Sequence, residues 1–375
     1  MTSQERIRAA IARAPLDRVP MLEIGFWIET IERFYREGMP RDHVFQSPLW
    51  SGGAYHTEHT VEDYFGLDRI TVMAYDGSLR LEQETLEETD TCRIFRNADG
   101  LTYKAFQNVT APPLCIGSTV KTPSDWEALK ERLAADPSRC FPGFAEAYRA
   151  AKEKNAYKVI KPEEGCQYAI YLLGDQACYE NMALNPDWIE DIIRTYTERQ
   201  IEMMEIILGQ GYEFDAMWVF SDLCYKNGML FSPGFYRERV MPYHKRLFDF
   251  CHGRGLQVIY HCDGLVERLL PLLIESGIDC IQPLEARCGN DVRKYKKQYA
   301  DAVAFMGNIN ADILGTTPER IEEEVREKLL AAKENSGYIF HSDHSVPPSV
   351  SLQNYTVAVE TAKKYGAYPS AASRR

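Results

Sequence analysis

The chain has 375 residues and a mass of 43.0 kDa, and its 45% hydrophobic and 26% charged residues are ordinary for a globular protein. Its 43 lysines and arginines face 55 aspartates and glutamates, which gives a net charge of −12. This balance argues against nucleic acid or an anionic membrane as the main partner.

The opening segment, MTSQERIRAAIARAP, is charged and lacks the apolar run of a signal peptide. No stretch reaches the roughly 18 apolar residues of a membrane-spanning helix. The ten cysteines form no CxxC pair, which is typical of reduced thiols. We therefore expect a cytoplasmic protein.

The first part of the chain mixes two patterns. Residues 4–13 predict a helix, and apolar runs at 19–24 and 70–73 are strand candidates. Between 78 and 106, polar and apolar residues alternate around an Asn-Ala-Asp-Gly turn, which predicts a β-hairpin outside the main sheet. The elements expected next are helices at 121–139 and 145–154 and a strand at 158–160.

From about residue 157, short apolar runs alternate with long amphipathic segments. The first long helix is marked by Asn185 as N-cap and Pro186 in its first turn. The predicted helices span 185–210, 232–254, 266–276, 292–299, 318–336 and 351–365. The predicted strands span 214–220, 257–260, 279–284, 302–306 and 338–340.

Repeated strand–helix units imply a parallel sheet, and the strand candidates number about eight. We therefore predict a (β/α)8 TIM barrel formed by a single domain, residues 1–375, with an N-terminal extension and a β-hairpin insertion at 78–106. A doubly wound α/β fold is the alternative. No glycine-rich dinucleotide or phosphate loop follows any predicted strand, so the barrel is favoured.

Polar side chains gather at the carboxyl ends of the predicted strands, where barrel enzymes place their active sites. His261 and Asp263 are two residues apart in an extended segment, so both can face one point. Glu285 ends the next strand and His344 follows a later one. Imidazoles and carboxylates from three strand ends would suit a divalent metal.

Structural roles for the same residues remain open. A single histidine after a strand is more often a hydrogen-bonded structural residue than a ligand. Asp263 and Gly264 could form the cap and turn of the next helix. Glu285 could pair with Arg287 or Arg293, and His344 could be a plain loop residue near Pro347-Pro348.

The segment GLQVIYHCDGLVERLLPLLIESGIDCIQPLE, at 255–285, resembles the uroporphyrinogen decarboxylase superfamily. It is more similar to the methyltransferase branch, which feeds corrinoid-dependent methyl transfer. VAFMGNIN at 303–310, GYIFHSDHSVPPSVSLQN at 337–354 and the stretch 187–242 fit the same superfamily. The resemblance covers most of the chain after about residue 155 and implies a (β/α)8 barrel.

The start of the chain separates the two branches. True decarboxylases carry an Arg-Gln-Ala-Gly-Arg segment that holds the carboxylates of the porphyrinogen, whereas the corresponding segment here is Glu-Ile-Gly-Phe-Trp at 23–27. Without arginine, and with Glu23 present, a polyanionic substrate would be repelled. The decarboxylase reaction is therefore not the expected one.

The methyltransferase branch and the related methionine synthase barrel bind zinc through a His-x-Cys pair, in some members a downstream Glu, and a late Cys. By this resemblance His261 matches the histidine, Asp263 stands at the first cysteine, Glu285 has the spacing of the glutamate, and His344 stands at the late cysteine. The predicted metal ligands are therefore His261, Asp263, Glu285 and His344, holding zinc or another divalent ion. The two thiolate positions carry an aspartate and a histidine instead, which puts the metal and the reaction in question.

Harder ligands leave an ion more electrophilic and better matched to an oxygen than to a thiol. We therefore expect a methyltransferase that moves a methyl group from an O-methyl donor, plausibly a methoxy-aromatic, to a corrinoid, which is an O-demethylation. Since the chain has no Asp-x-His-x-x-Gly motif, the corrinoid would be carried by a separate protein. Asp222 and Tyr225 are the candidate catalytic acids. The expected substrate contacts are Glu23, Trp27, Trp218, Asn308 and Asp343, with Phe26 and Phe220 as further aromatic wall candidates.

Other functions stay open at this point. A decarboxylase-like lyase or a metal-dependent hydrolase acting on a small organic acid could use the same ligands, and so could a non-enzymatic binding protein. We expect no nucleic acid and no membrane among the partners, and a homodimer is possible. His56 and His59 are spaced like a metal pair but lie in a region typical of loops.

Overall fold

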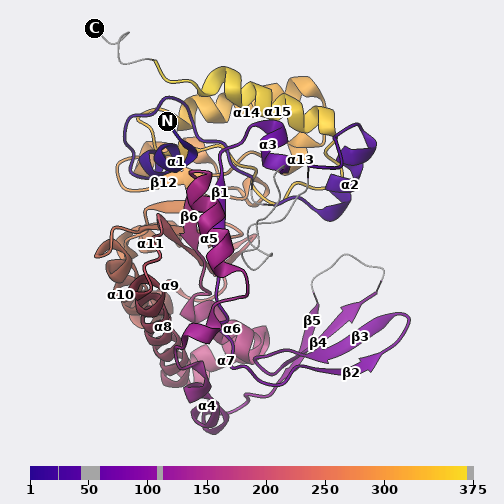
Figure 1. The fold of residues 1–375 in the computed structure, drawn as a ribbon. Coiled ribbons are helices and arrows are strands. Elements are labelled where there is room, and N and C mark those ends of the chain that lie inside the picture. The colour runs from indigo at the N-terminus through magenta and orange to yellow at the C-terminus, as the bar shows by residue number, and fades with distance from the viewer. Residues whose placement is uncertain (24, 44–59, 108–112, 370–375) are drawn as a thin grey trace.

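The computed structural model describes residues 1–23, 25–43, 60–107, 113–369 of the chain (Figure 1). His56 and His59, and with them the expected histidine pair, lie outside the described residues. No helix in the described part of the chain is long and apolar enough to cross a membrane.

The centre of the molecule is a curled sheet of seven parallel strands. Apolar side chains make these strands almost wholly buried, because helices cover one face of the sheet and the other face encloses the barrel core. In spatial order the strands are β1 (Ile70–Met73), β6 (Tyr157–Ile160), β7 (Ala216–Phe220), β10 (Gln257–Cys262), β11 (Cys280–Pro283), β12 (Ala304–Met306) and β13 (Tyr338–Ile339). The α/β class and the TIM-like arrangement are thus confirmed, with seven regular strands where eight were expected.

The eighth position, between β13 and β1, is filled by an irregular segment. Met21 forms an isolated parallel bridge with Phe340, and the Leu22 amide donates to the Phe340 carbonyl at 2.9 Å. On the other side the Asp68 amide donates to the Met21 carbonyl at 2.7 Å. Pro20 has no amide hydrogen to offer, which explains why the predicted strand at 19–24 forms bridges but no regular ladder.

Helix α1 (Ser3–Ile11) closes the amino-terminal end of this barrel-like sheet. Thr2 and Glu5 form a capping box at its start. Its buried Ile7 and Ile11 pack in one apolar cluster with inward side chains of the strands, among them Val72 and Ile339. The predicted helix at 4–13 is therefore the plug of the barrel base.

The other helices surround the sheet. Most predicted helices are confirmed, but the one expected at 121–139 ends at Leu129. Two short 3-10 turns, Lys130–Leu133 and Pro137–Arg139, replace its second half, and Pro137 opens the second of them. Five helices, α2, α3, α6, α7 and α13, were not predicted. The helices are α2 (Ile28–Arg36), α3 (Val61–Phe65), α4 (Pro123–Leu129), α5 (Phe144–Glu153), α6 (Gly165–Leu173), α7 (Asp175–Leu184), α8 (Pro186–Gly209), α9 (Pro233–Phe235), α10 (Met241–His252), α11 (Leu270–Ser276), α12 (Val292–Tyr299), α13 (Ala311–Leu314), α14 (Pro318–Ala332) and α15 (Leu352–Gly366).

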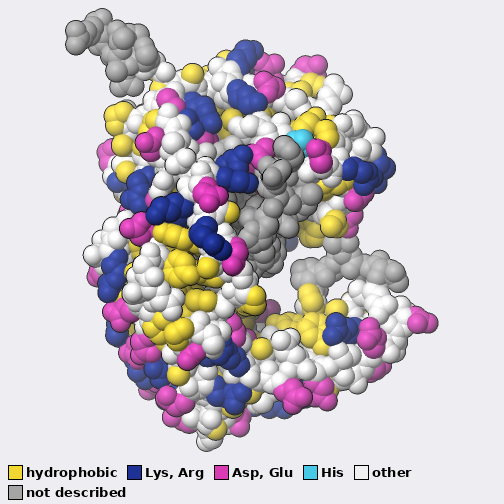
Figure 2. All heavy atoms as spheres, in the orientation of Figure 1, with side chains coloured by type: hydrophobic (Ala, Val, Ile, Leu, Met, Phe, Trp, Pro, Cys, Tyr) yellow, Lys and Arg dark blue, Asp and Glu magenta, His cyan; other side chains and the backbone are white. Residues whose placement is uncertain are grey.

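The predicted hairpin is part of a larger antiparallel sheet that projects from the body (Figure 1). It consists of β2 (Glu84–Glu88), β3 (Cys92–Arg96), β4 (Leu101–Phe106) and β5 (Leu114–Ser118). The turn between β3 and β4 is the expected Asn-Ala-Asp-Gly sequence, in which the Asn97 side chain accepts from two backbone amides and Gly100 takes a φ of +82°. Figure 2 shows a hollow between this sheet and the part of the body that carries α2, with hydrophobic side chains gathered on the sheet beside it.

Candidate functional site

A cavity of about 420 Å³ lies at the carboxyl ends of the parallel strands. This volume is within the roughly 300–1,000 Å³ of small-molecule sites. Its walls come from the loop before α2, from α6, from the ends of β7, β10 and β11, and from the loop after β13. The lining residues are Gly25, Phe26, Trp27, Ile28, Tyr171, Phe220, Asp222, His261, Asp263, Gln282, Pro283, His341, His344 and Ser345.

Three side chains converge on one side of this cavity. Asp222, His261 and Asp263 each offer one ligand atom, and these atoms lie within 4.8 Å of one another. His261 Nε2 is 3.5 Å from Asp222 Oδ1 and 3.7 Å from Asp263 Oδ1. One nitrogen and two carboxylate oxygens from adjacent strand ends are a suitable set for a divalent cation.

The ring of His261 is held on both sides. Its Nδ1 lies 2.6 Å from Gln282 Oε1, and because an amide oxygen only accepts, Nδ1 carries the hydrogen and Nε2 keeps its lone pair toward the carboxylates. The ring also stacks on Phe220, with centroids 3.9 Å apart and planes 13° apart. Gln282 and Phe220 therefore orient His261 as a ligand.

Asp263 is the carboxylate of this group whose contacts best suit a cation. Its Oδ1 is buried and accepts no hydrogen bond from any residue in the described part of the chain. Burial raises the pKa of this carboxyl, and Asp222 and Glu285 raise it further, while His261 and His344 lower it. His344 Nε2 lies 3.9 Å from Asp263 Oδ2, close enough to join the group with a small shift.

Asp222 was predicted as an acid, and the geometry places it among the candidate ligands. Its Oδ1 accepts from the Asp263 amide at 3.0 Å, and its own amide donates to Gln167 Oε1 at 2.6 Å. These bonds fix the loop after β7 against the end of β10. The carboxylate is half-exposed and faces the cavity.

Glu285 is engaged elsewhere. Arg287 donates to its Oε1 at 2.7 and 3.0 Å, and the Gly264 amide donates to its Oε2 at 2.6 Å. Burial opposes its ionisation, but these donors prevail and lower its pKa. The structure thus places three predicted ligands, His261, Asp263 and His344, at the cavity, and leaves Glu285 as a brace for the turn after β10.

Three further predicted residues do not line the cavity. Trp218 is fully buried in the barrel core below it. Tyr225 lies on the short strand β8 (Cys224–Tyr225), which pairs with β9 (Gly228–Met229), and its backbone carbonyl accepts from the Leu265 amide. Asn308 is fully buried, and its amide joins the Leu284 and Asn290 carbonyls at 2.7 and 2.9 Å.

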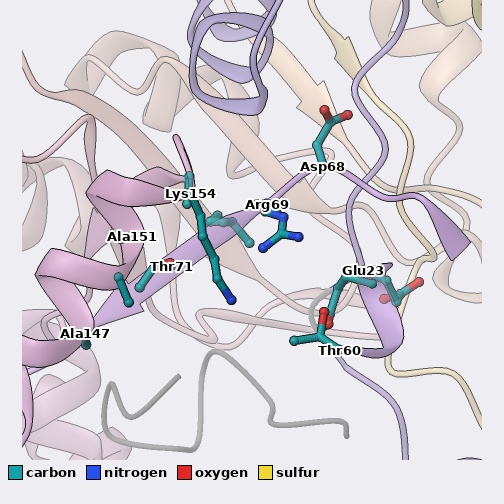
Figure 3. Close-up of a pocket in the computed structure, with 12 residues that line it drawn as sticks. Glu23, Thr60, Asp68, Arg69, Thr71, Ala147, Ala151 and Lys154 are labelled. Atoms are coloured by element: carbon teal, nitrogen blue, oxygen red, sulfur yellow. The ribbon is translucent and has the colours of Figure 1, made fainter. Parts of the chain in front are cut away.

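Glu23 sits behind the cavity. Its Oε1 is 3.3 Å from His341 Nε2, and Oε2 accepts from Tyr355 Oη at 3.4 Å. It lines a separate cavity of about 50 Å³, which Figure 3 shows together with Thr60, Arg69 and other residues. This space is too small for a substrate, so Glu23 is placed as a buried support of His341.

A neighbouring cavity of about 200 Å³ adjoins the main one through Trp27. Trp27 lines both, as do His344 and Ser345, whereas Asp343 lines only the second. The Asp343 carboxylate accepts from the Ala286 and Ala311 amides, both at 2.8 Å, so its oxygens mainly hold two loops together.

Sequence reasoning did not propose several residues of the cavity, among them Tyr171, Gln282 and His341. His341 directly follows the strand predicted at 338–340, so the rule that led to His261 could have found it. Gln282 lies inside the strand predicted at 279–284, two residues before its end. Burial lowers the pKa of His341 to about 4, which keeps it neutral. Tyr171 lies on the unpredicted helix α6 and had no such signal.

Comparison with known proteins agrees with this architecture. The uroporphyrinogen decarboxylase (URO-D) family model matches residues 116–365. Uroporphyrinogen decarboxylases of Streptomyces avermitilis and Chlorobium limicola are 32% and 33% identical over 133 and 137 residues, which are 34% and 35% of this chain. These alignments span 35% and 38% of the two relatives, so the chain matches little more than a third of their length.

Among solved structures, a methyltransferase from Methanosarcina mazei has the same fold. The two superpose with a TM-score of 0.66 over 97% of this chain and 99% of the other, at 17% sequence identity. At this identity the likeness concerns the fold alone.

Proposed function

Because the chain belongs to the uroporphyrinogen decarboxylase (URO-D) family, we propose that it is a metal-dependent methyltransferase. Its reaction takes the methyl group of an O-methyl donor, a methoxylated aromatic, and passes it to a corrinoid carried by a separate protein. The carbon–oxygen bond of the ether breaks as the methyl carbon bonds to cobalt, and the oxygen leaves with the electron pair. The observation that supports this proposal most directly is the Asp222–His261–Asp263 group in an aromatic-walled cavity.

These three residues fit a divalent ion. Asp263 Oδ1 is buried without a hydrogen bond, and His261 Nε2 is left free by the bond of Nδ1 to Gln282. Zinc accepts such nitrogen and oxygen ligands, and His344 is placed to supply a further one. When bound, the ion supplies Lewis acidity toward the ether oxygen.

Side chains that line the cavity are placed to bind and orient the methyl donor. Phe26, Trp27, Tyr171 and Phe220 line the cavity and can hold an aromatic ring against the strand ends. Asp222 and Asp263 would hold the ion on their side of the cavity, and the ether oxygen would be oriented toward that side, since the negative charge that develops on it needs a cation and not an apolar wall. The second cavity, which shares Trp27 and His344, gives room for larger ring substituents.

The same surfaces disfavour porphyrinogen decarboxylation. A polyanionic tetrapyrrole needs arginines or lysines as counter-charges, and the described residues that line the main cavity include neither. The charge of these walls therefore supports methyl transfer over decarboxylation as the reaction that we propose.

The test is metal content and methyl transfer measured on the same preparations. Zinc-loaded protein is mixed with a methoxy-aromatic and free reduced cobalamin, and formation of methylcobalamin is followed by visible absorbance. We expect His261→Ala to lose the bound ion and to slow methyl transfer at least 100-fold, because the remaining two carboxylates bind zinc weakly without the imidazole.

His252→Ala is the matched control, because His252 lies on the surface of α10 and pairs with Asp279 outside the cavity. It should keep both the ion and the activity. Methyl transfer by metal-free protein at the rate of the zinc-loaded form would refute the Lewis-acid role.

A further inference from the structure

The described residues that line the main cavity include carboxylates, histidines and aromatic rings but no lysine or arginine. Asp222 and Asp263 are its carboxylates, and its three histidines are His261, His341 and His344. Lysine and arginine are absent from the described residues that line it. The burial of His341 lowers its pKa to about 4, so this ring adds no positive charge at neutral pH.

The nearest cations are already engaged. Lys161 Nζ lies over the Phe220 ring, 4.6 Å from its centroid, and is 3.5 Å from Glu163 Oε1. In the neighbouring cavity Arg287 is paired with Glu285 at 2.7 Å and shares the lining with Asp312 and Asp343. That cavity therefore offers a carboxylate-rich wall and not an anion site.

An anionic ligand in the cavity would therefore lose its hydration without gaining a lysine or arginine counter-ion from the described residues that line it.

We propose that the cavity selects methoxylated aromatics that carry no anionic group, so that the methyl donors are neutral aryl ethers and not methoxybenzoates. This inference rests on the proposed function, which makes the ligand a methyl donor. The selection for neutral ligands is argued from the charges of the side chains that line the cavity. The neutral ring is held by the aromatic side chains, and a carboxylate on that ring would face Asp222 and Asp263 or an apolar wall.

Equilibrium binding tests the selection without any turnover. Isothermal titration calorimetry compares 2-methoxyphenol with 4-hydroxy-3-methoxybenzoate, which differ by one carboxylate, on the full chain in metal-free and zinc-loaded form. We expect the neutral ether to bind at least tenfold more tightly in both forms. A methoxylated phenyltrimethylammonium serves as the cationic probe and should not exceed the neutral ether.

A charge introduced at the rim gives the second readout. Ile28 begins α2, lines the cavity and is 72% exposed, so an arginine is tolerated there without burial. Ile28→Arg should raise the affinity for the methoxybenzoate at least fivefold and leave that for the neutral ether within twofold. Ile28→Gln, which adds length but no charge, should change neither.

Each other result counts against the inference. Equal or tighter binding of the methoxybenzoate would overturn it, and so would a tenfold preference for the cation or binding of none of the three probes. If the carboxylate binds tightly only with zinc present, it ligates the ion and the selection is wrong. Methyl transfer is measured separately, so a protein that selects neutral ethers but transfers no methyl group would refute the proposed reaction and leave the selection standing.

Discussion

At the scale of single residues, the site is organised by which atoms are left without a partner. His261 uses Nδ1 for Gln282 and keeps Nε2 for the cavity, and Asp263 keeps one buried oxygen bare. Glu285 is the opposite case, since Arg287 and a backbone amide take its oxygens. A carboxylate whose two oxygens already accept hydrogen bonds is a weaker candidate for a metal ligand.

Gln282 is therefore expected to control metal affinity through His261. Gln282→Leu removes the acceptor that fixes the Nδ1–H form of the ring, and zinc affinity should fall about 10–100-fold. A competition titration against a chromophoric chelator measures this. Gln282→Glu keeps an acceptor at the same place and should retain most of the affinity; wild-type affinity in the leucine variant would show that the ring is oriented by Phe220 alone.

Glu23 is expected to make the folded state less stable as the pH rises. Burial raises its pKa to about 8 from the ordinary 4.5, so the folded state holds a proton that the unfolded state has released. Between the two pKa values stability must fall as pH rises, and from pH 6 to pH 8 the loss is about 2 kcal/mol. Glu23→Gln, which keeps the shape of the protonated form, should lose less stability over this interval in urea titrations at the two pH values. A variant with the same pH dependence as the wild type would contradict the assignment.

The sequence predicted these residues correctly where their spacing along a strand determines the side on which their side chains lie. The i, i+2 relation of His261 and Asp263 in an extended segment was enough to bring them together, and His344 followed from its place after a strand. Glu285 has the same position at a strand end. In the structure, however, Glu285 pairs with Arg287, two residues later. Whether a glutamate at this position contacts an arginine or a metal depends on the path of the loop after β11, which the sequence does not specify.

At the scale of elements, the least regular part closes the sheet. Residues 19–22 occupy the eighth position through isolated hydrogen bonds, and Asp68 fastens them to β1. Its buried carboxylate accepts from the Met21 amide at 2.9 Å, from Arg6 at 2.5 Å and from Arg18 at 2.7 Å. The hydrogen bonds and ion pairs of Asp68 thus take the place of a regular ladder of backbone hydrogen bonds at the segment that contains Pro20.

Asp68→Asn should consequently destabilise the protein by about 3 kcal/mol, because it leaves Arg6 and Arg18 near a neutral group in a buried setting. The free energy of unfolding from urea titration is the measurement. Asp90→Asn, an exposed change in the turn between β2 and β3, is the control and should stay within about 0.5 kcal/mol. Equal effects of the two variants would show that the ion cluster does not hold the eighth position.

Helices with a clear apolar face, or with a proline that marks their first turn, could be predicted from the sequence. Buried helices without a polar face could not. Helix α8 begins at Pro186 as expected. Helix α6 is buried on almost all sides, so its sequence lacks the polar face by which a helix is recognised. It supplies Tyr171 to the cavity, so the site was incomplete in the prediction for the same reason.

At the scale of the whole molecule, binding of an ion and stability of the fold are thermodynamically linked. A ligand that binds only the folded state stabilises it in proportion to its saturation. Because the candidate ligands come from the loop after β7 and the end of β10, a bound ion ties two adjacent units of the sheet together.

Zinc should therefore raise the thermal midpoint of unfolding. At a free concentration of 100 times Kd the stabilisation is about 2.7 kcal/mol, and differential scanning fluorimetry with and without zinc detects it. Magnesium, which prefers six oxygen ligands, should shift the midpoint less. His261→Ala should show no zinc shift; a shift equal to that of the wild type would place the ion elsewhere.

The plug at the barrel base has a consequence for synthesis of the chain. Helix α1 packs against β12 and β13 as well as β6, so it is synthesised well before the last strand of the sheet, which forms part of its binding surface. At about 5–20 residues per second, roughly 15–65 seconds separate the two. During that interval Ile7 and Ile11 lack part of the apolar surface that buries them in the folded protein, so we expect α1 to stay accessible to a nascent-chain chaperone until β13 has been synthesised.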